Sequence, residues 1–191
     1  GVHVNFAPVI DVNNNPANPV INDRSFGEDK SNVCIKSYNY MKGMQDNQIL
    51  ASAKHFPGHG DTDVDSHKSL PILYHDMNRL DSLELFPFRY LIKKGISSIM
   101  VAHLFVPAID STLNLPTTLS PKAVNQMLKT DLGFKGLVFT DALNMGGVTK
   151  YYKPGEADVM ALVAGNDVLL FPNEVGLVID EIKKAITSGL I

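Results

Sequence analysis

The sequence predicts an α/β fold in which helices cover a parallel β-sheet. Five short segments are apolar almost throughout, which is typical of strands buried on both faces. A segment with helical spacing or helix-boundary residues follows each of them, as in repeated βα units. Both a doubly wound sheet and a (β/α)8 barrel have this order of elements. No GxGxxG or GxxxxGK[ST] pattern follows any of these strands, which argues against a nucleotide-binding sheet.

The expected strands are rich in β-branched and aromatic residues, and turn-forming residues separate them from their neighbours. The first strand leads into NNNPANP, which we expect to be part of a long loop. The five strands are expected at residues 2–12, 49–56, 97–104, 136–143 and 167–172.

The first two helices are predicted from their spacing and their ends. Residues 30–45 carry apolar side chains at helical spacing, and Asp29 is suited to the N-cap position. A second helix is expected to begin at Asn78 or Asp81. It should stop at Gly95, because glycine adopts the left-handed conformation that commonly ends a helix.

Three further helices are expected in the second half of the chain. Ser120 and Pro121 form a helix start, with a capping hydroxyl followed by proline in the first turn, and Gly133 ends that helix. Residues 154–164 form a short helix and residues 174–188 form the last one.

Length and composition limit the classes of function. The 191 residues suffice for one domain, so we expect a single domain over residues 1–191. A net charge of −3 offers no basic surface for nucleic acid. No apolar run is long enough to cross a membrane. The single cysteine, Cys34, cannot form an internal disulfide and leaves the compartment undetermined. Because Gly1 enters directly into an expected strand, we expect the natural N-terminus and any targeting signal to be missing.

Ionisable residues stand at the ends of four expected strands. They are Asp11, the pair Lys54 and His55, His103, and Asp141. A charged group next to a core is costly unless it is paired or used. In a parallel α/β barrel the C-terminal ends of the strands carry the active site. These residues therefore predict a functional site on one common face.

Residues 54–67, KHFPGHGDTDVDSH, read as a loop that holds titratable groups. In an extended segment Asp65 and His67 project to the same side, so Asp65 can accept the Nδ1 proton of His67 and leave Nε2 for proton exchange with a substrate. The alternative is a pair of polar residues on a solvated loop. Gly58 and Gly60 suggest that the loop is mobile and swings over a ligand.

Metal binding is the other chemistry to consider for this loop. A calcium loop beginning at Asp61 would need glycine at its sixth position and glutamate at its twelfth, where this chain has Ser66 and Ile72. Zinc lacks the support of an HExxH pattern or a cysteine pair. We therefore expect neither a metal nor another cofactor.

Asp141 follows an apolar strand in FTDALNMGG, where small neighbours leave space for a substrate. It is either a nucleophile or a helix-capping aspartate. Lys54 and His55 have donors suited to sugar hydroxyls but could equally form structural pairs. Arg24 could clamp substrate oxygens or pair with a nearby acid.

Three motifs together resemble a known family. NFAPVIDVNNNPANPVINDRSFGED, KHFPGHGDTDVDSH and FTDALNMGG are similar, in order and spacing, to those of bacterial β-N-acetylglucosaminidases of glycoside hydrolase family 3. The similarity extends over essentially the whole chain. It implies a (β/α)8 TIM-type barrel that removes terminal β-linked N-acetylglucosamine, with retention of configuration, from peptidoglycan fragments or chitooligosaccharides.

The resemblance also implies roles for the motif residues. A carboxylate nucleophile forms a glycosyl-enzyme intermediate, and a histidine replaces the usual second carboxylate as acid/base. By motif match, Asp141 is the nucleophile, His67 the acid/base, Asp65 the residue that orients it, and Arg24, Lys54 and His55 the binders of sugar hydroxyls.

The expected barrel is incomplete, because only about five parallel strands are present in the chain. Open sheet edges of this kind predict self-association. The carbohydrate is the one other partner that we expect. Three alternatives stay open: a β-glucosidase of the same family, a phosphorylase that uses phosphate in place of water, and a sugar-binding module without catalysis.

Overall fold

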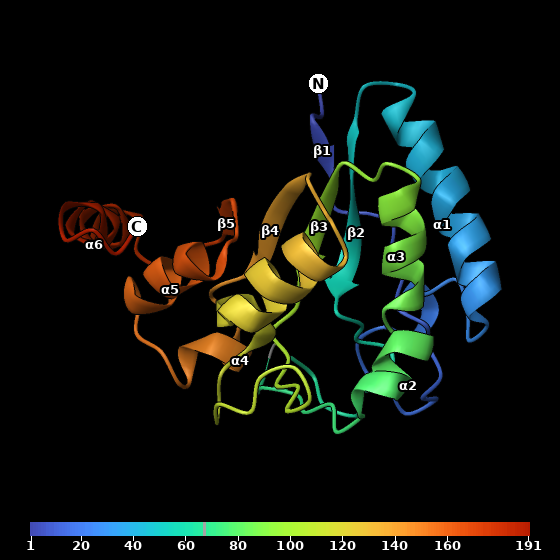
Figure 1. Ribbon diagram of the computed structural model, residues 1–191, viewed down its shortest axis with the longest axis horizontal. Helices are drawn as coiled ribbons and strands as arrows, with labels where there is room; N and C mark the ends of the chain where they lie inside the picture. Colours follow the sequence, from blue (N-terminus) through green and yellow to red (C-terminus); the bar gives the residue numbers. More distant parts are fainter. Residues whose placement is uncertain (67) are drawn as a thin grey trace.

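The computed structural model describes residues 1–66 and 68–191, and its strands form one parallel sheet in chain order (Figure 1). Every neighbouring pair of strands is parallel. The α/β class predicted from the sequence is confirmed. The strands are β1 (Val4–Asn5), β2 (Leu50–Phe56), β3 (Ser98–Val101), β4 (Leu137–Ala142) and β5 (Val168–Leu170).

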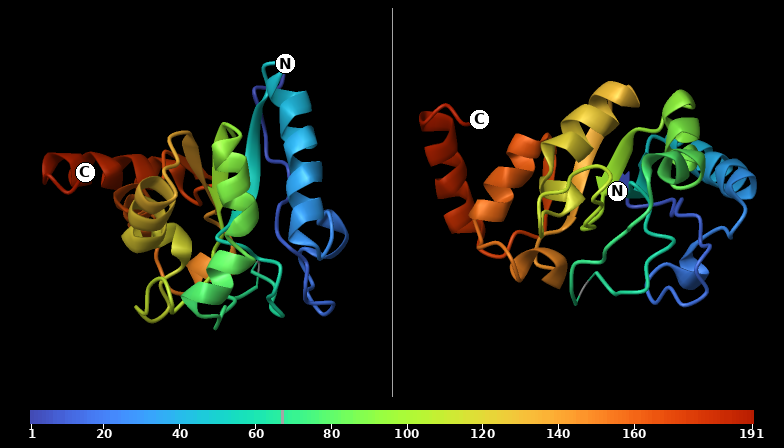
Figure 2. Two further views of the ribbon diagram at one scale, coloured as in Figure 1. Left: turned by 45° about the vertical axis from the view of Figure 1, so that its right-hand side comes forward. Right: turned by 60° about the horizontal axis from the view of Figure 1, so that its bottom comes forward.

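Helices connect successive strands and pack on the outer side of a curled sheet (Figure 2). The arrangement corresponds to part of a TIM-type barrel, in which each strand is followed by a helix of the outer ring. The helices are α1 (Lys30–Gln45), α2 (Met77–Ser82), α3 (Phe86–Lys93), α4 (Gly146–Thr149), α5 (Glu156–Ala164) and α6 (Val175–Thr187), with 3₁₀ turns η1 (Asn22–Arg24) and η2 (Thr117–Leu119) and the π-helix η3 (Lys122–Asp131).

The main hydrophobic core lies between the sheet and these helices. All of β3 is buried, because helices cover its outer side and the curled sheet encloses its inner side. Phe56 of β2 meets Phe88 of α3 edge to face, with ring centroids 5.2 Å apart. Such aromatic pairs add to the stabilisation that burial of their area provides. This packing fixes where β2 and the loop that follows it leave the sheet.

The predicted helix ends agree with the structure where a local cap specifies them. The Asp29 carboxylate accepts a hydrogen bond from the Asn32 backbone N–H at 2.7 Å, so α1 starts where its capping residue predicts. Gly95 and Gly133 both have positive φ, at 82° and 70°, and follow the ends of α3 and η3. These boundaries are properties of the local sequence.

Three expected elements differ from the structure. The first strand pairs only at Val4–Asn5 and again at an isolated bridge at Val9, because Pro8 lacks the N–H that a continuous ladder needs. The helix expected to end at Gly95 is two helices, and α2 starts after the cap Asp76. The chain turns between them, and Pro87 lies in the first turn of α3, the position that tolerates proline. The third difference is the π-type hydrogen bonding of η3.

The C-terminal ends of all the strands lie at the same end of the sheet. The long loops after β2, β3 and β4 gather there, at the bottom of Figure 1. Within the described part of the chain, no helix combines the length and apolarity required to cross a membrane.

Candidate active site

A pocket of about 300 Å³ lies at the C-terminal ends of the strands. Its polar wall contains Arg24 together with Lys54, His55 and Asp141, three of the strand-end residues that the sequence placed on one face. His59, Ser66 and apolar side chains close the remainder. The full lining is Phe6, Val20, Arg24, Lys54, His55, His59, Ser66, Met100, Asp141, Ala142, Leu170 and Phe171.

Asp11 is the buried anchor of the polar wall. Its carboxylate accepts the backbone N–H groups of His55 and His59, at 3.1 and 2.7 Å, and the Nδ1 proton of His55 at 2.8 Å. Burial alone would raise the pKa of Asp11, but the two histidines and these hydrogen bonds outweigh it and hold the pKa below its usual value. Asp11 is therefore ionised, and it fixes both histidines.

Arg24 determines the tautomer of His55. Arg24 Nη2 lies 3.4 Å from His55 Nε2, and a guanidinium has only donors, so Nε2 accepts. The His55 proton consequently stays on Nδ1, facing Asp11. Arg24 also donates to the Val20 carbonyl at 3.1 Å. Its five N–H groups exceed these two contacts, so the same guanidinium can bind ligand oxygens at the mouth of the pocket.

Lys54 lies beside Arg24 at the end of β2, where its side chain is partly buried. Burial and the positive charge of Arg24 lower the pKa of Lys54, and the carboxylates of Asp141 and Asp11 oppose that shift. The peptide bond between Lys54 and His55 is cis. Both side chains line the pocket, so Lys54 presents an ammonium donor next to Asp141.

Asp141 lies within β4, one residue before its end, and has the properties of an ionised carboxylate. Burial acts to raise the pKa of Asp141, but nearby His55 and His103, the Ala142 N–H and Lys54 together bring it below its usual value. The Ala142 N–H donates to Asp141 Oδ1 at 2.8 Å. An anionic oxygen in a pocket with donors on its walls can attack an electrophilic carbon.

His103, the fourth strand-end residue, lies behind the pocket and does not line it. Its ring is fully buried, with Nδ1 2.8 Å from the Thr118 hydroxyl and Nε2 donating to the Ala142 carbonyl at 3.0 Å. His103 thus holds the backbone immediately after Asp141. Its position at a strand end correctly predicted that it lies near the site. The ring itself contacts the backbone behind the pocket and does not face the pocket.

His59 and Ser66 were not predicted as site residues, yet both line the pocket. His59 is 1% exposed, and burial together with the neighbouring His55 lowers the pKa of His59 to about 4. One hydrogen bond joins His59 Nδ1 to Thr62 Oγ1 at 2.7 Å, and another joins Nε2 to Ser66 Oγ at 3.1 Å. The sequence signal for this histidine was its place between two glycines in the loop.

Close packing, not freedom to swing, explains those two glycines. A Cβ at Gly60 would lie 1.9 Å from the Val12 carbonyl oxygen, and a Cβ at Gly58 would lie 2.8 Å from Glu84 Cβ. Gly58 also has φ +132°, which disfavours any other residue. These contacts give the two glycines a packing role in a buried part of the loop, and the expected mobility of the loop stays a prediction.

The predicted acid/base pair is only partly within the described residues. His67 lies outside them. The Asp65 carbonyl accepts backbone N–H groups from Lys68 and Ser69, at 2.9 and 3.1 Å. Asp65 does not line the pocket, whereas the adjacent Ser66 does. The geometry of the pair therefore stays a prediction.

One residue of the loop considered above for metal binding, Asp61, belongs to a cluster of potential metal ligands. In the described part of the chain, Asp61, His75 and Glu84 have ligand atoms within 4.8 Å of one another. Arg79 already donates to Asp61 at 3.3 Å and to Glu84 at 3.1 Å. Since this guanidinium supplies the positive charge that a cation would bring, the cluster is accounted for as an ion-pair network that ties the loop to α2.

A curled parallel sheet with helices outside, and charged groups gathered at the C-terminal strand ends, defines a TIM-type α/β domain with an enzyme-like pocket. The model of the glycosyl hydrolase family 3 N terminal domain matches residues 1–191. The chain belongs to this family.

Individual relatives support the same assignment. The chain is 40% identical over 182 residues to β-hexosaminidase A of Pseudoalteromonas piscicida, covering 90% of this chain and 30% of that protein. It is 36% identical over 197 residues to β-hexosaminidase LpqI of Mycobacterium tuberculosis, covering 99% of this chain and 50% of that protein. Among solved structures, a family 3 β-N-acetylglucosaminidase from Paenibacillus sp. str. FPU-7 superposes with a TM-score of 0.96 at 42% identity, covering 99% of this chain and 36% of that one. The chain thus spans half or less of the length of these relatives.

Proposed function

We propose that the protein carrying this chain is a retaining exo-β-N-acetylglucosaminidase that acts on peptidoglycan fragments or chitooligosaccharides. The observation that carries the proposal is the ionised Asp141 carboxylate in a pocket whose walls hold Arg24, Lys54 and His55. The names of the relatives support N-acetylhexosaminides as the substrate class. The natural substrate is the finer part of the proposal and rests on the sequence resemblance.

In this mechanism Asp141 attacks the anomeric carbon as the bond to the leaving group breaks. The product of the first step is a glycosyl ester of Asp141, and water then displaces the carboxylate with a second inversion, so the configuration is retained. His67, oriented by Asp65, gives a proton to the departing oxygen and later takes one from the attacking water. The two steps share one proton-transfer group.

The donors on the pocket wall bind the sugar. Lys54 and the Arg24 guanidinium direct N–H groups at hydroxyl oxygens, and His55 is held by Asp11 in a fixed tautomer. Because contacts of 2.8–3.4 Å hold the His55 ring between Asp11 and Arg24 before substrate arrives, little ordering of this ring is left to the binding step.

The first test replaces the nucleophile. In the complete gene product, Asp141→Asn should lower kcat on an aryl β-N-acetylglucosaminide by about 10⁴-fold or more, since a neutral amide cannot form the ester. Asp131→Asn on η3, whose side chain is exposed and bonds Gln126, is the matched control and should be unchanged. NMR of the first-formed product should show the β-anomer. An Asp141→Asn variant with near-normal turnover would rule out this nucleophile.

The second test separates acid catalysis from nucleophilic attack. His67→Ala should lower kcat/KM strongly on disaccharides, whose leaving groups need a proton, and far less on activated aryl glycosides. Equal loss on both substrate classes would contradict the acid/base role.

The same assays discriminate the alternatives. Turnover that requires inorganic phosphate would identify a phosphorylase, and preference for glucosides would identify a β-glucosidase. Calorimetric binding of N-acetylglucosamine by a sample without turnover would identify a sugar-binding module.

A further inference from the structure

Ser66 connects the loop after β2 to the turn after β4. It is 2% exposed, and its carbonyl accepts the backbone N–H of Gly147 at 3.2 Å. Gly147 lies in α4, six residues beyond Asp141. A Cβ at Gly147 would lie 3.2 Å from that same carbonyl oxygen, so the two backbones are in close contact. The position of Ser66 therefore sets the spacing between the two loops.

The side chain of Ser66 is held from the other direction by His59. Its hydroxyl forms a hydrogen bond of 3.1 Å with His59 Nε2. His59 is itself fixed at three points: its ring Nδ1 bonds Thr62 at 2.7 Å, its N–H donates to Asp11 at 2.7 Å, and its carbonyl accepts from Asn18 Nδ2 at 2.8 Å. His59 thus connects Asp11, the anchor of the polar wall, to Ser66 through hydrogen bonds at both ends.

Ser66 is also the residue between Asp65 and His67, the pair that carries the proton in the proposed mechanism. Its carbonyl and its hydroxyl are both held, so the backbone at Ser66 is fixed on two sides. We propose that His59 is a positioning residue for proton transfer, which acts by holding Ser66, the neighbour of both members of the pair, against the turn after β4. This inference rests on the proposed function.

Two other roles for His59 make different predictions. As a purely structural residue it would affect stability, with equal effects on all substrates. As a group that contacts the sugar it would raise KM for every substrate that carries the same sugar. A positioning residue for proton transfer affects the step that needs the proton, so its loss depends on the leaving group.

The experiment compares four variants in the complete gene product. Ser66→Ala and His59→Asn both break the bond between the ring position and Ser66, since an asparagine amide reaches Thr62 but is too short for Ser66. His59→Gln extends an amide toward Ser66 and serves as the conservative rescue. Thr62→Val removes the other hydroxyl on the same ring and is the matched control.

We expect Ser66→Ala and His59→Asn to lower kcat/KM on disaccharides by about 10- to 100-fold, the scale of loss when a catalytic group is misplaced by about 1 Å. On activated aryl glycosides the loss should stay below about 3-fold, because those leaving groups need little protonation. His59→Gln should recover most of the disaccharide activity, and Thr62→Val should lose less than Ser66→Ala.

Three results would overturn the inference: Ser66→Ala with wild-type kcat/KM on both substrate classes, an equal loss on both, or a Thr62→Val loss as large as that of Ser66→Ala. Should the His59 variants not fold, as judged by circular dichroism, the comparison of Ser66→Ala with Thr62→Val decides alone. A wild-type protein without activity on either N-acetylglucosaminide would instead overturn the proposed function itself, so the two failures are distinguishable.

Discussion

Arg24, His55 and Asp11 form a chain in which each group determines the state of the next. The guanidinium cannot accept, so it leaves the His55 proton on Nδ1, where the buried Asp11 carboxylate accepts it. The neighbouring His55 and His59, with their hydrogen bonds to the carboxylate, in turn hold the pKa of Asp11 below its usual value. A fixed-charge residue at the pocket mouth thereby sets the tautomer of a residue inside it.

The lowered pKa of His59 predicts how the free energy of unfolding depends on pH. Its pKa falls from 6.5 to about 4 on folding, mainly because the ring is buried. The folded state therefore binds fewer protons than the unfolded state between these values, so the stabilisation is complete above pH 6.5 and is lost as pH falls toward 4. At 1.36 kcal/mol per pKa unit, we expect the free energy of unfolding to fall by roughly 3 kcal/mol across this window.

Urea denaturation from pH 7 to pH 4 measures this dependence. In His59→Gln, which carries no titratable ring, the decrease in this window should be much smaller. The acids with lowered pKa values, Asp11 and Asp141, contribute below their ordinary pKa of 3.8 and lie outside the window. A wild-type curve parallel to that of His59→Gln would contradict the prediction.

The loop after β2 is an element whose two parts have different tasks. Residues 57–62 are packed into the scaffold through Asp11, Asn18 and Glu84. The next residues connect this base to Ser66, which reaches the turn after β4. Gly58 and Gly60 in this base are required by close contacts, so they have a packing role there.

Two glycine substitutions test this distinction. Gly60→Ala would place a methyl group 1.9 Å from the Val12 carbonyl oxygen, a contact that forces the backbones apart. We expect it to lower the free energy of unfolding by about 3 kcal/mol or more, beyond the usual range for a single substitution at the surface.

Gly43→Ala is the matched control. Gly43 is exposed in the interior of α1, and its added methyl group meets nothing within 4 Å. It should raise the free energy of unfolding by about 0.5–1 kcal/mol, because alanine favours the helix. Thermal unfolding of both variants gives the comparison. If both substitutions changed the free energy of unfolding by similar amounts, the close contact at Gly60 would not constrain the loop as proposed.

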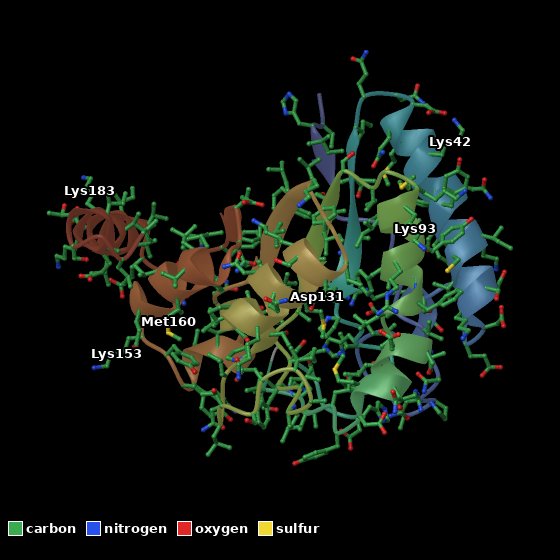
Figure 3. The ribbon with its side chains drawn as sticks, in the orientation of Figure 1. Lys42, Lys93, Asp131, Lys153, Met160 and Lys183 are labelled. Carbon is green, nitrogen blue, oxygen red and sulfur yellow. The ribbon has the colours of Figure 1, made fainter. Side chains whose placement is uncertain are left out.

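At the scale of the molecule, the sheet is open at both edges. Within the described residues, β1 pairs only with β2, and β5 only with β4. Phe171, directly after β5, is 65% exposed. In the described residues, α6 follows β5 in the chain, and Lys153 and Lys183 point outward on this side of the molecule (Figure 3). Unpaired parallel edges next to exposed apolar side chains are places where another chain can add.

We therefore expect residues 1–191, expressed alone, to self-associate. Sedimentation velocity should show a species larger than the 20.9 kDa monomer, in a proportion that rises with concentration. Phe171→Lys should weaken this association, because a charge next to an edge strand opposes pairing. Leu113→Lys replaces a residue that is 75% exposed in a loop distant in sequence from both edges, and it should have little effect. A monomer at all concentrations would contradict the expectation.

Much of the fold could be predicted from local sequence. Apolar runs located the strands, and Asp29, Gly95 and Gly133 located helix ends, since caps and left-handed turns depend on neighbouring residues. The break between α2 and α3 was missed. There the helix-forming residues on both sides of Leu83–Leu85 resemble one continuous helix, and tertiary packing ends the first one.

The candidate site divides in the same way. The sequence by itself determined that Asp141, Lys54 and His55 lie together, because the C-terminal ends of parallel strands lie at the same end of the sheet. Only the tertiary structure decided that His59 and Ser66 join them, that Asp11 anchors them, and that the glycines of the loop are packed. Those contacts join residues whose separation depends on strand register and loop path. Local conformational preferences do not encode them, and they form only when the sheet brings distant segments within hydrogen-bonding distance.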